Sequence, residues 1–219
     1  MKVAVLGATG RTGVLVVEQA LRRGHGVVAY VRRAGGLQPS EGLRIVVGEL
    51  VDSEHLRSAL SDVDVVICCL GTRRHKPVDL MQNNLPRIVQ AMKRAGCTRL
   101  ILLSAYGVGE TARTASLVAR VLYKTMFRSI FRDKERSEAG LATSSLDWTG
   151  VYPVGLTDAP LIEAVEVRPT SEAKKVRGLP QVSRANVAKV LLDAAGDGRA
   201  IGQKLLVTSK GSSLPRVPR

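Results

Sequence analysis

Aromatic residues are scarce in this chain, making up only 3% of its 219 residues. A buried core must therefore be built from Val, Leu, Ala and Ile, and few side chains are left to stack on nucleic-acid bases. No recognisable nucleic-acid-binding motif offsets this shortage, so we expect no nucleic acid partner. Apolar runs of membrane-spanning length are also missing, and the chain begins with a strand and a turn instead of a signal peptide.

Cysteine and acidic residues are also few. Two of the three cysteines, Cys68 and Cys69, are adjacent in an apolar run, which is unlike a disulfide framework, so we expect a reducing cytoplasm. The 33 Lys and Arg residues outnumber the 19 Asp and Glu residues and leave a net charge of +14. This surplus can attract anionic small molecules such as a dinucleotide phosphate, but we assign most of it to a solvated surface.

The length and the hydrophobic content of 45% suit one well-buried domain and are too small for two. We assign residues 1–208 to this domain and expect the basic tail 209–219 to be disordered. Residues 108–132 and 155–180 carry no readable motif, and we expect these segments to cover the substrate. No metal site is predicted.

A glycine-rich turn, Gly7-Ala8-Thr9-Gly10-Arg11-Thr12-Gly13, separates the apolar run Lys2–Leu6 from the run Val14–Leu21. The first run predicts a strand and the second a helix. Glycines let the backbone approach an anion closely, and a helix N-terminus offers N–H groups and a partial positive charge. The spacing is G-x-x-G-x-x-G instead of the commoner G-x-G-x-x-G, so the turn by itself is also compatible with a simple strand end.

The second informative position lies at the end of the next apolar run, Val27–Val31, where Arg32 and Arg33 follow. Dinucleotide folds that prefer NAD place an acidic residue about 20 residues beyond the glycine turn, where it binds the ribose 2′-hydroxyl. A guanidinium pairs instead with a 2′-phosphate, so this position predicts NADP(H) as the cofactor. The alternative is that both arginines are ordinary loop charges.

Strands alternate with helices along most of the chain. Further strands are predicted at Leu43–Leu50, Val63–Leu70, Leu100–Leu103, Leu146–Tyr152 and Gln203–Thr208. Helices are predicted at Ser53–Leu60 (capped by Asp52 or Ser53), from Asn83 or Asn84 to Ala95 with Pro86 in the first turn, and at Val187–Ala195 after Ser183 or Asn186. This pattern indicates an α/β fold, a single-domain Rossmann-like doubly wound parallel sheet.

Five predicted strand ends carry residues suited to a ligand. They are the glycine turn, Arg32, Glu49-Leu50, Leu70-Gly71-Thr72 and Ser104. Ligands of doubly wound sheets bind beyond the carboxyl ends of the strands. We therefore expect all five to meet at one crevice, and Pro153-Val154-Gly155 to start a loop that faces it.

Residues 111–136 follow a helical spacing with an apolar side, and seven Lys or Arg against two acidic residues lie between Arg113 and Arg136. Such a basic amphipathic helix can lie on a membrane surface. We favour the other interpretation, in which it covers the sheet and exposes its charged face to solvent.

Together these motifs resemble the atypical short-chain dehydrogenase/reductase group, the single-domain NAD(P)H-binding proteins related to NmrA. The likeness is greatest to its NADPH-dependent flavin and biliverdin reductase branch, and it spans roughly residues 1–208. The segments that carry it are Gly7–Gly13, Val31-Arg32-Arg33, Val47-Gly48-Glu49-Leu50, Leu70-Gly71-Thr72-Arg73, Ser104-Ala105, Leu146-Asp147-Trp148-Thr149 and Ser183-Arg184-Ala185-Asn186-Val187-Ala188.

The resemblance implies that NADP(H) lies across the strand ends. The pyrophosphate would be held by Gly7, Thr9, Gly10, Arg11, Thr12 and Gly13, and the 2′-phosphate by Arg32, next to Arg33. Glu49, where family members usually carry Asp, and Leu50 would flank the adenine. Residues beside the ribose and phosphates would be Leu70, Gly71, Thr72 and Arg73, and those beside the nicotinamide Ser104, Pro153 and Val154.

The family's proton relay is incomplete in this chain. The relay is a Tyr four residues before a Lys, with a Ser nearby; the Tyr donates a proton to a carbonyl and the Lys lowers its pKa. Lys134 and Ser104 match the pattern, and Glu138 follows as in the group, but Ile130 stands where the Tyr should be. Tyr106 and Tyr123 lack the spacing. Ser104 and Lys134 are thus the remaining catalytic candidates.

The favoured hypothesis is an NADPH-dependent reductase whose acceptor is a flavin, quinone or tetrapyrrole-like molecule, with Arg73 attracting an anionic group of that acceptor. A non-catalytic NADP(H)-sensing regulator of the NmrA kind is the alternative. A sugar-nucleotide epimerase or dehydratase fits less well, because it needs the missing Tyr and a larger substrate domain.

Overall fold

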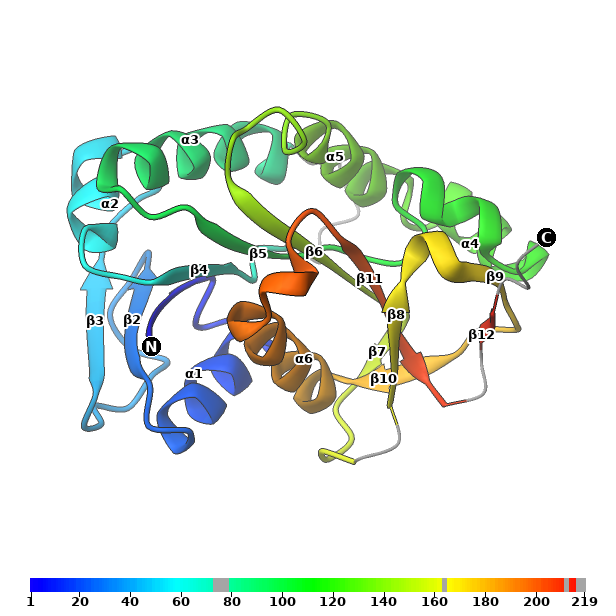
Figure 1. Ribbon diagram of the computed structural model, residues 1–219, viewed down its shortest axis with the longest axis horizontal. Coiled ribbons are helices and arrows are strands. Elements are labelled where there is room, and N and C mark those ends of the chain that lie inside the picture. The colour runs from blue at the N-terminus through cyan, green and yellow to red at the C-terminus, as the bar shows by residue number, and fades with distance from the viewer. Residues whose placement is uncertain (73–78, 163–164, 211–212, 216–219) are drawn as a thin grey trace.

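An eight-stranded sheet crosses the middle of the molecule (Figure 1) in the order β3-β2-β1-β4-β5-β6-β11-β8. The computed structural model describes residues 1–72, 79–162, 165–210 and 213–215. All neighbouring strands of this sheet are parallel except β11 and β8. The strands are β1 (Lys2–Leu6), β2 (Gly26–Val31), β3 (Leu43–Val47), β4 (Val65–Cys68), β5 (Arg99–Leu103), β6 (Asp147–Pro153), β8 (Val165–Pro169) and β11 (Lys204–Ser209). The predicted doubly wound fold is confirmed, with the antiparallel edge strand β8 as an addition.

Helices cover both faces of the sheet (Figure 1). On one face lie α1 (Gly13–Arg22) and α6 (Arg184–Gly196); on the other lie α2 (Ser53–Leu60), α3 (Leu80–Ala95) and α5 (Arg128–Glu138). Strand β1 supplies both cores, because successive side chains point to opposite faces. Val3 and Val5 belong to the cluster that includes α1 and α6, whereas Ala4 and Leu6 belong to the cluster with α2 and α3. This two-sided burial accounts for the near-continuous apolar runs in the strands.

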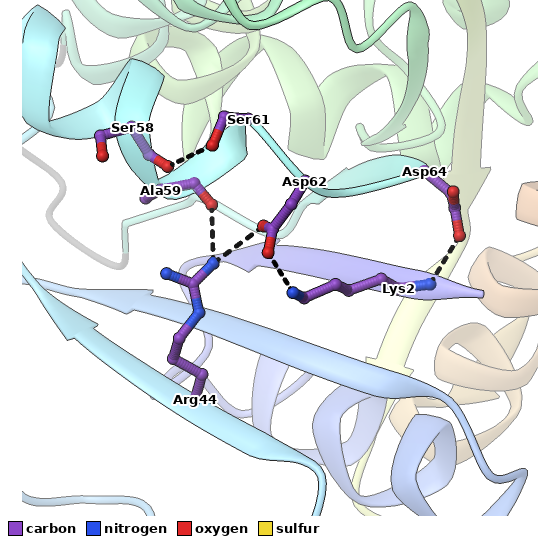
Figure 2. Close-up of polar contacts among 7 residues, drawn as sticks. All are labelled: Lys2, Arg44, Ser58, Ala59, Ser61, Asp62 and Asp64. Atoms are coloured by element: carbon purple, nitrogen blue, oxygen red, sulfur yellow. Dashed lines mark hydrogen bonds and ion pairs between the residues drawn. The ribbon is translucent and has the colours of Figure 1, made fainter.

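A polar network holds the amino-terminal ends of the strands together (Figure 2). The side chain of Lys2 pairs with Asp62, and its backbone N–H donates to Asp64 at 2.7 Å. Arg44 of β3 donates to the same Asp62 carboxylate at 3.0 Å and to the carbonyl of Ala59 at 3.3 Å. The hydrogen bond from Lys2 lowers the pKa of Asp62. These bonds therefore fix the amino-terminal ends of β1 and β3, on the side of the sheet opposite the carboxyl ends of the strands.

Two predicted strands are too long. Leu43–Leu50 is strand only as far as Val47, and Val63–Leu70 is strand only over Val65–Cys68. Leu50 and Leu70 lie in the loops that follow these strands and pack against the core cluster of α2 and α3. Their apolar side chains therefore extend the apolar runs beyond the strands themselves. The shorter strands leave those loops free to line the carboxyl edge of the sheet.

Helix α3 begins earlier than predicted, at Leu80, so Pro86 lies inside the helix and neither Asn83 nor Asn84 caps it. Asp79 occupies the N-cap position, but its side chain makes no capping hydrogen bond. The cap comes from another helix: the buried carboxylate of Asp133 in α5 accepts hydrogen bonds from the backbone N–H groups of residues 81 and 82, at 2.9 and 3.0 Å. A cap supplied from about fifty positions away has no signal in the local sequence.

Residues 111–136 do not form the single helix predicted for them. A 3-10 turn, η1 (Gly109–Thr114), precedes α4 (Leu117–Thr125). The helix is then interrupted before α5 begins at Arg128. Across the break, Tyr123 of α4 packs against Phe131 of α5, with ring centroids 4.9 Å apart. Among the described helices, none combines the length and apolar character that crossing a bilayer requires.

The carboxyl-terminal third adds two small sheets. Pro153 ends β6, and Gly155 begins β7 (Gly155–Thr157), which pairs in parallel with β10 (Gln181–Ser183). The prediction that a loop starts at Pro153-Val154-Gly155 is therefore wrong. Strand β9 (Ala173–Val176) pairs with β12 (Ser213–Pro215), so part of the predicted disordered tail is instead a strand, while residues 211–212 and 216–219 lie outside the described ranges. Short 3-10 turns occur at η2 (Thr170–Glu172) and η3 (Gly198–Ala200). The predicted cap of α6 is confirmed, because Ser183 Oγ accepts from the N–H of Asn186 at 3.1 Å.

Replacing Asp133 with Ala should lower the free energy of unfolding by about 2 kcal/mol, because two backbone N–H groups of α3 lose a charged acceptor. Urea denaturation followed by circular dichroism measures this loss. Asp79→Ala is the matched control, because it removes a carboxylate at the N-cap position whose side chain makes no capping hydrogen bond. This variant should leave the urea midpoint nearly unchanged. Equal losses in both variants would contradict the cap from α5.

Candidate functional site

A cavity of about 660 Å³ opens at the carboxyl edge of the sheet. Its size lies within the range of small-molecule and cofactor sites. Loops after β1, β2, β3 and β4 supply its walls, together with the first half of α3. Of the predicted cofactor residues it brings together Gly7, Thr9, Gly10, Arg32, Glu49, Leu50, Leu70, Gly71 and Thr72. Four of the five predicted strand ends therefore meet at one site.

The glycine turn leaves no room for side chains at its first and third glycines. Gly7 has a φ of +79°, and a Cβ atom there would lie 3.0 Å from the backbone carbonyl of Cys69. At Gly13 a Cβ atom would overlap the carbonyl oxygen of Gly7. The first turn of α1 holds no acidic residue, so its positive end faces the crevice without a competing carboxylate. The turn fits a bound diphosphate.

Several predicted cofactor residues do not line this cavity. Arg11 is exposed and forms an ion pair with Asp158, which also pairs with Arg184 at 2.7 Å. Thr12 is buried behind the turn, at the N-cap position of α1, and Arg33 is exposed. Their contacts to a cofactor stay predictions. Arg73 lies outside the described residues.

The loop after β3 is fixed by a tyrosine of β2. Tyr30 Oη donates to the backbone carbonyl of Glu49 at 3.1 Å. Burial, followed by the charges of Asp52 and Glu49, raises the pKa of Tyr30, so its hydroxyl stays a donor. Gly48 is close against the same ring, and a Cβ atom there would overlap the hydroxyl. The position of Glu49 is thus set by its main chain, and the exposed residue lines the cavity.

Sequence reasoning missed the wall that α3 contributes. Asn83, Asn84 and Arg87 all line the cavity, so Arg87 is a second cation there beside Arg32. Their spacing puts them on one face of a helix, and this polar face was the available signal. The prediction of Asn83 or Asn84 as a helix cap conceals this face, because a cap residue would lie before the helix and not on it.

Ser104, at the end of β5, lies in a separate buried group. Its hydroxyl donates to Glu138 Oε1 at 2.5 Å, and Tyr152 Oη donates to Glu138 Oε2 at 2.6 Å. Burial, then the charge of Glu138, raises the pKa of Tyr152 far above its ordinary value, so the phenol keeps its proton. Pro153 and Val154, predicted beside the nicotinamide, follow Tyr152 and are buried. Tyr152 carries no motif and was also missed.

Lys134 is buried, and its ammonium donates to the carbonyl oxygen of Leu103 at 2.9 Å. Ile130 stands one helical turn earlier. Neither Tyr106 nor Tyr123 replaces the missing tyrosine. Tyr106 is hydrogen-bonded to Thr114 at 2.7 Å, and burial raises its pKa to about 12. Tyr123 packs on the ring of Phe131 in α5. No tyrosine among the described residues hydrogen-bonds to Lys134, so the relay is not rebuilt from another position.

The profile of the family described as NAD(P)H-binding matches residues 7–197. The chain belongs to this NAD(P)H-binding family. The match spans the glycine turn, α6 and every strand of the large sheet except β1 and β11, and it confirms the predicted NAD(P)H-binding fold. The crevice described above is therefore the candidate for its NAD(P)H site.

Relatives and solved structures agree with this assignment. An uncharacterised chloroplastic protein of Arabidopsis thaliana is 30% identical across 88% of this NAD(P)H-binding chain and 71% of its own length. Protein TIC 62, chloroplastic, of the same plant is 26% identical across 99% of this chain, which spans only 37% of that relative. Because both relatives are chloroplastic, a cytoplasmic location stays a prediction.

Two solved structures show the same fold at lower identity. The anaerobilin reductase ChuY of Escherichia coli O157:H7 has a TM-score of 0.79 and 21% identity, with full coverage of both chains. A short-chain dehydrogenase/reductase of Veillonella parvula, solved in complex with NADP, has a TM-score of 0.81 and 20% identity over 97% of this chain and 96% of that one.

Gly13→Ala should destabilise the protein by about 2 kcal/mol, because the added methyl overlaps the carbonyl oxygen of Gly7, and a backbone atom cannot move aside as a flexible side chain can. Thermal unfolding and NADPH titration of the same samples should show a lower Tm and weaker binding. The control is Gly198→Ala, where nothing lies within 4 Å of the new methyl. If Gly13→Ala matched that control in both measurements, the close approach of α1 to the turn would be wrong.

Proposed function

We propose that the protein is an NADPH-dependent reductase that transfers a hydride to a flavin or a similar conjugated small molecule. The observation that carries this proposal is the incomplete relay: Ile130 replaces the proton donor, and Lys134 is held by the carbonyl of Leu103. A carbonyl substrate needs a positioned acid as the hydride arrives. A flavin ring needs proximity and orientation, and its proton can come from water.

The chain's own residues account for cofactor choice and placement. Bound NADPH would supply the hydride. The N-terminus of α1 and the glycine turn would hold the pyrophosphate. Arg32, exposed at the cavity wall, would pair with the 2′-phosphate, and no acidic residue occupies that position to favour NADH. Ser104 would orient the nicotinamide end or the acceptor.

An NADP(H)-sensing regulator is the second candidate. It is favoured by the internal hydrogen bonds of Ser104, Tyr152 and Lys134, whose polar groups are all occupied within the protein. A sensor needs the cofactor crevice but no proton donor. An epimerase or dehydratase is not proposed, because Ile130 cannot serve its relay.

NADPH oxidation, followed at 340 nm with FMN, riboflavin, a quinone and a linear tetrapyrrole, separates the two candidates. The reductase should turn over at least one of these acceptors. Tight NADPH binding by calorimetry without turnover of any acceptor would contradict the reductase and support the sensor. Absence of binding to both nicotinamide cofactors would contradict both.

Arg32→Ala should weaken NADPH binding by about tenfold or more and leave NADH binding nearly unchanged, because only NADPH carries the phosphate that the guanidinium contacts. Isothermal titration with both cofactors measures the difference. Arg136→Ala is the control, since Arg136 is also exposed but does not line the cavity. Similar losses for NADPH and NADH in Arg32→Ala would remove the 2′-phosphate assignment.

Tyr152→Phe should keep flavin reduction within about threefold of the unmodified protein, because a protonated, buried phenol bound to Glu138 is not needed when water supplies the proton. The readout is kcat with FMN under NADPH saturation. A decrease of about a hundredfold, with the fold intact by circular dichroism, would show that this hydroxyl is the proton donor and that the water-supplied mechanism is wrong.

A further inference from the structure

Helix α4 lies mostly in solvent. Only Ala119 of its nine residues is buried. Three of its aliphatic side chains form an exposed stripe: the exposed fraction is 75% for Leu117, 63% for Val118 and 56% for Val121. The sequence predicts that the apolar side of this segment covers the sheet, and for α4 this prediction is wrong. An aliphatic stripe in water is unfavourable unless another surface covers it.

Two neighbouring residues extend this apolar surface. Leu179, in the loop before β10, is exposed, and Ser116 Oγ at the N-cap of α4 donates to the carbonyl oxygen of Gly178 at 2.6 Å, which holds this loop against the helix. Met126, directly after α4, is exposed as well. Figure 1 shows α4 at the opposite end of the molecule from α2 and β3. We call the exposed apolar residues of this region the α4 face; they are Leu117, Val118, Val121, Met126 and Leu179.

Cationic side chains border the α4 face. Arg120 and Lys124 each follow an aliphatic residue of the stripe by three positions, which places them beside it on the surface of the helix. Together with three arginines of η1 and α5 they surround a second cavity, of about 280 Å³, in which Glu135 is the only acidic lining residue. The three arginines are Arg113, Arg128 and Arg132.

The protein does not neutralise these cations. All five are exposed, and none of them forms an ion pair or a hydrogen bond with a described residue. Glu110, in the same 3-10 turn as Arg113, pairs instead with Lys204 at 2.6 Å, and this hydrogen bond lowers the pKa of Glu110. Elsewhere on the surface Arg23 pairs with Asp193. Like charges gathered around one hollow repel each other, so this region favours an anionic partner.

Charge and shape together select the partner. A second copy of this chain would bring the same cations against each other in a two-fold contact, which like charges oppose. A groove for the apolar side of a partner helix is missing, because the residues of the α4 face line neither of the two cavities. An anionic lipid bilayer offers phosphates to the cations and an apolar interior to the aliphatic stripe, while long Arg and Lys side chains reach the headgroup layer.

We propose that the α4 face docks on an anionic lipid bilayer. The aliphatic stripe of α4 enters the interfacial layer, and lipid phosphates lie among the cations around the second cavity. The two cavities share no lining residue, so docking uses none of the groups at the glycine turn and is independent of the proposed reductase function.

Sedimentation of the full chain with lipid vesicles tests this docking. Vesicles of phosphatidylcholine alone are compared with vesicles that contain about 30% phosphatidylglycerol, an anionic lipid. Partitioning onto the anionic vesicles should be at least about tenfold stronger than onto the neutral ones, because only they offer negative charge to the cations. Raising NaCl from about 0.1 M to about 0.5 M should weaken this binding, since salt screens exposed charges.

Two double variants locate the contact on α4. Leu117→Gln/Val121→Gln removes most of the aliphatic stripe, and Arg120→Gln/Lys124→Gln removes the two cations beside it. Each should lower partitioning onto the anionic vesicles by about tenfold or more, because the bilayer contact needs both the apolar and the charged groups. All four side chains are exposed, so circular dichroism and Tm should stay unchanged, which separates loss of the contact from unfolding.

The controls remove matching groups from other surfaces. Val47→Gln/Ile201→Gln replaces two exposed aliphatic residues outside α4, and Arg22→Gln/Lys93→Gln removes two positive charges from α1 and α3. None of these four residues lines either cavity. Both controls should bind the anionic vesicles as the unmodified protein does.

Four results would overturn the docking of α4 on a bilayer. The first is equal partitioning onto neutral and anionic vesicles, and the second is binding that survives both α4 variants. The third is an equal loss in Arg22→Gln/Lys93→Gln, which would assign the binding to the net charge of +14 instead of a defined face. The fourth is a dimer in sedimentation velocity without lipid that Leu117→Gln/Val121→Gln dissociates, which would make a second copy the partner. NADPH oxidation enters none of these measurements, so each result leaves the proposed reductase function as it stands.

Discussion

The absence of space between Gly13 and the carbonyl oxygen of Gly7 is the constraint on which the site depends. It brings the first turn of α1 directly onto the end of β1, so the positive end of the helix opens into the crevice. The loops after β2, β3 and β4 then complete the walls of the crevice around the N-terminus of α1. Strand order 3-2-1-4-5-6 brings them there, since β2, β3, β4 and β5 flank β1 on both sides and all run in the same direction.

The framework of the fold could be predicted from the sequence because local patterns determine it. Apolar runs of strand length, the glycine turn and Asp52 as a helix cap all carry their signal within a few residues. The same locality explains why most of the predicted cofactor residues lie together at one crevice: each follows a strand, and the carboxyl ends of parallel strands lie on the same side of the sheet. Arg32 is the clearest example, since its position follows from β2 alone.

The remaining features depend on contacts between distant segments. Asp133 caps a helix that begins more than fifty residues earlier, and Glu138 accepts hydrogen bonds from both Ser104 and Tyr152. The break between α4 and α5 follows from packing of Tyr123 and Phe131 over Gly107, which helical periodicity cannot indicate. Strand β8 lies at the edge of the sheet and is likewise held by pairing with β11. Its own segment has little apolar character, so the local sequence does not indicate a strand.

The bond from Asp133 to the first turn of α3 has a mechanical consequence. Helix α3 forms a wall of the crevice at the glycine turn through Asn83, Asn84 and Arg87, while α5 lines the second cavity, of about 280 Å³, through Arg132. One buried carboxylate joins the first turn of α3 to α5, so a shift of one helix alone would break these two hydrogen bonds. Coupling of this kind is thermodynamically reciprocal: to the degree that filling one compartment repositions its helix, it changes the affinity of the second compartment, and the reverse holds equally.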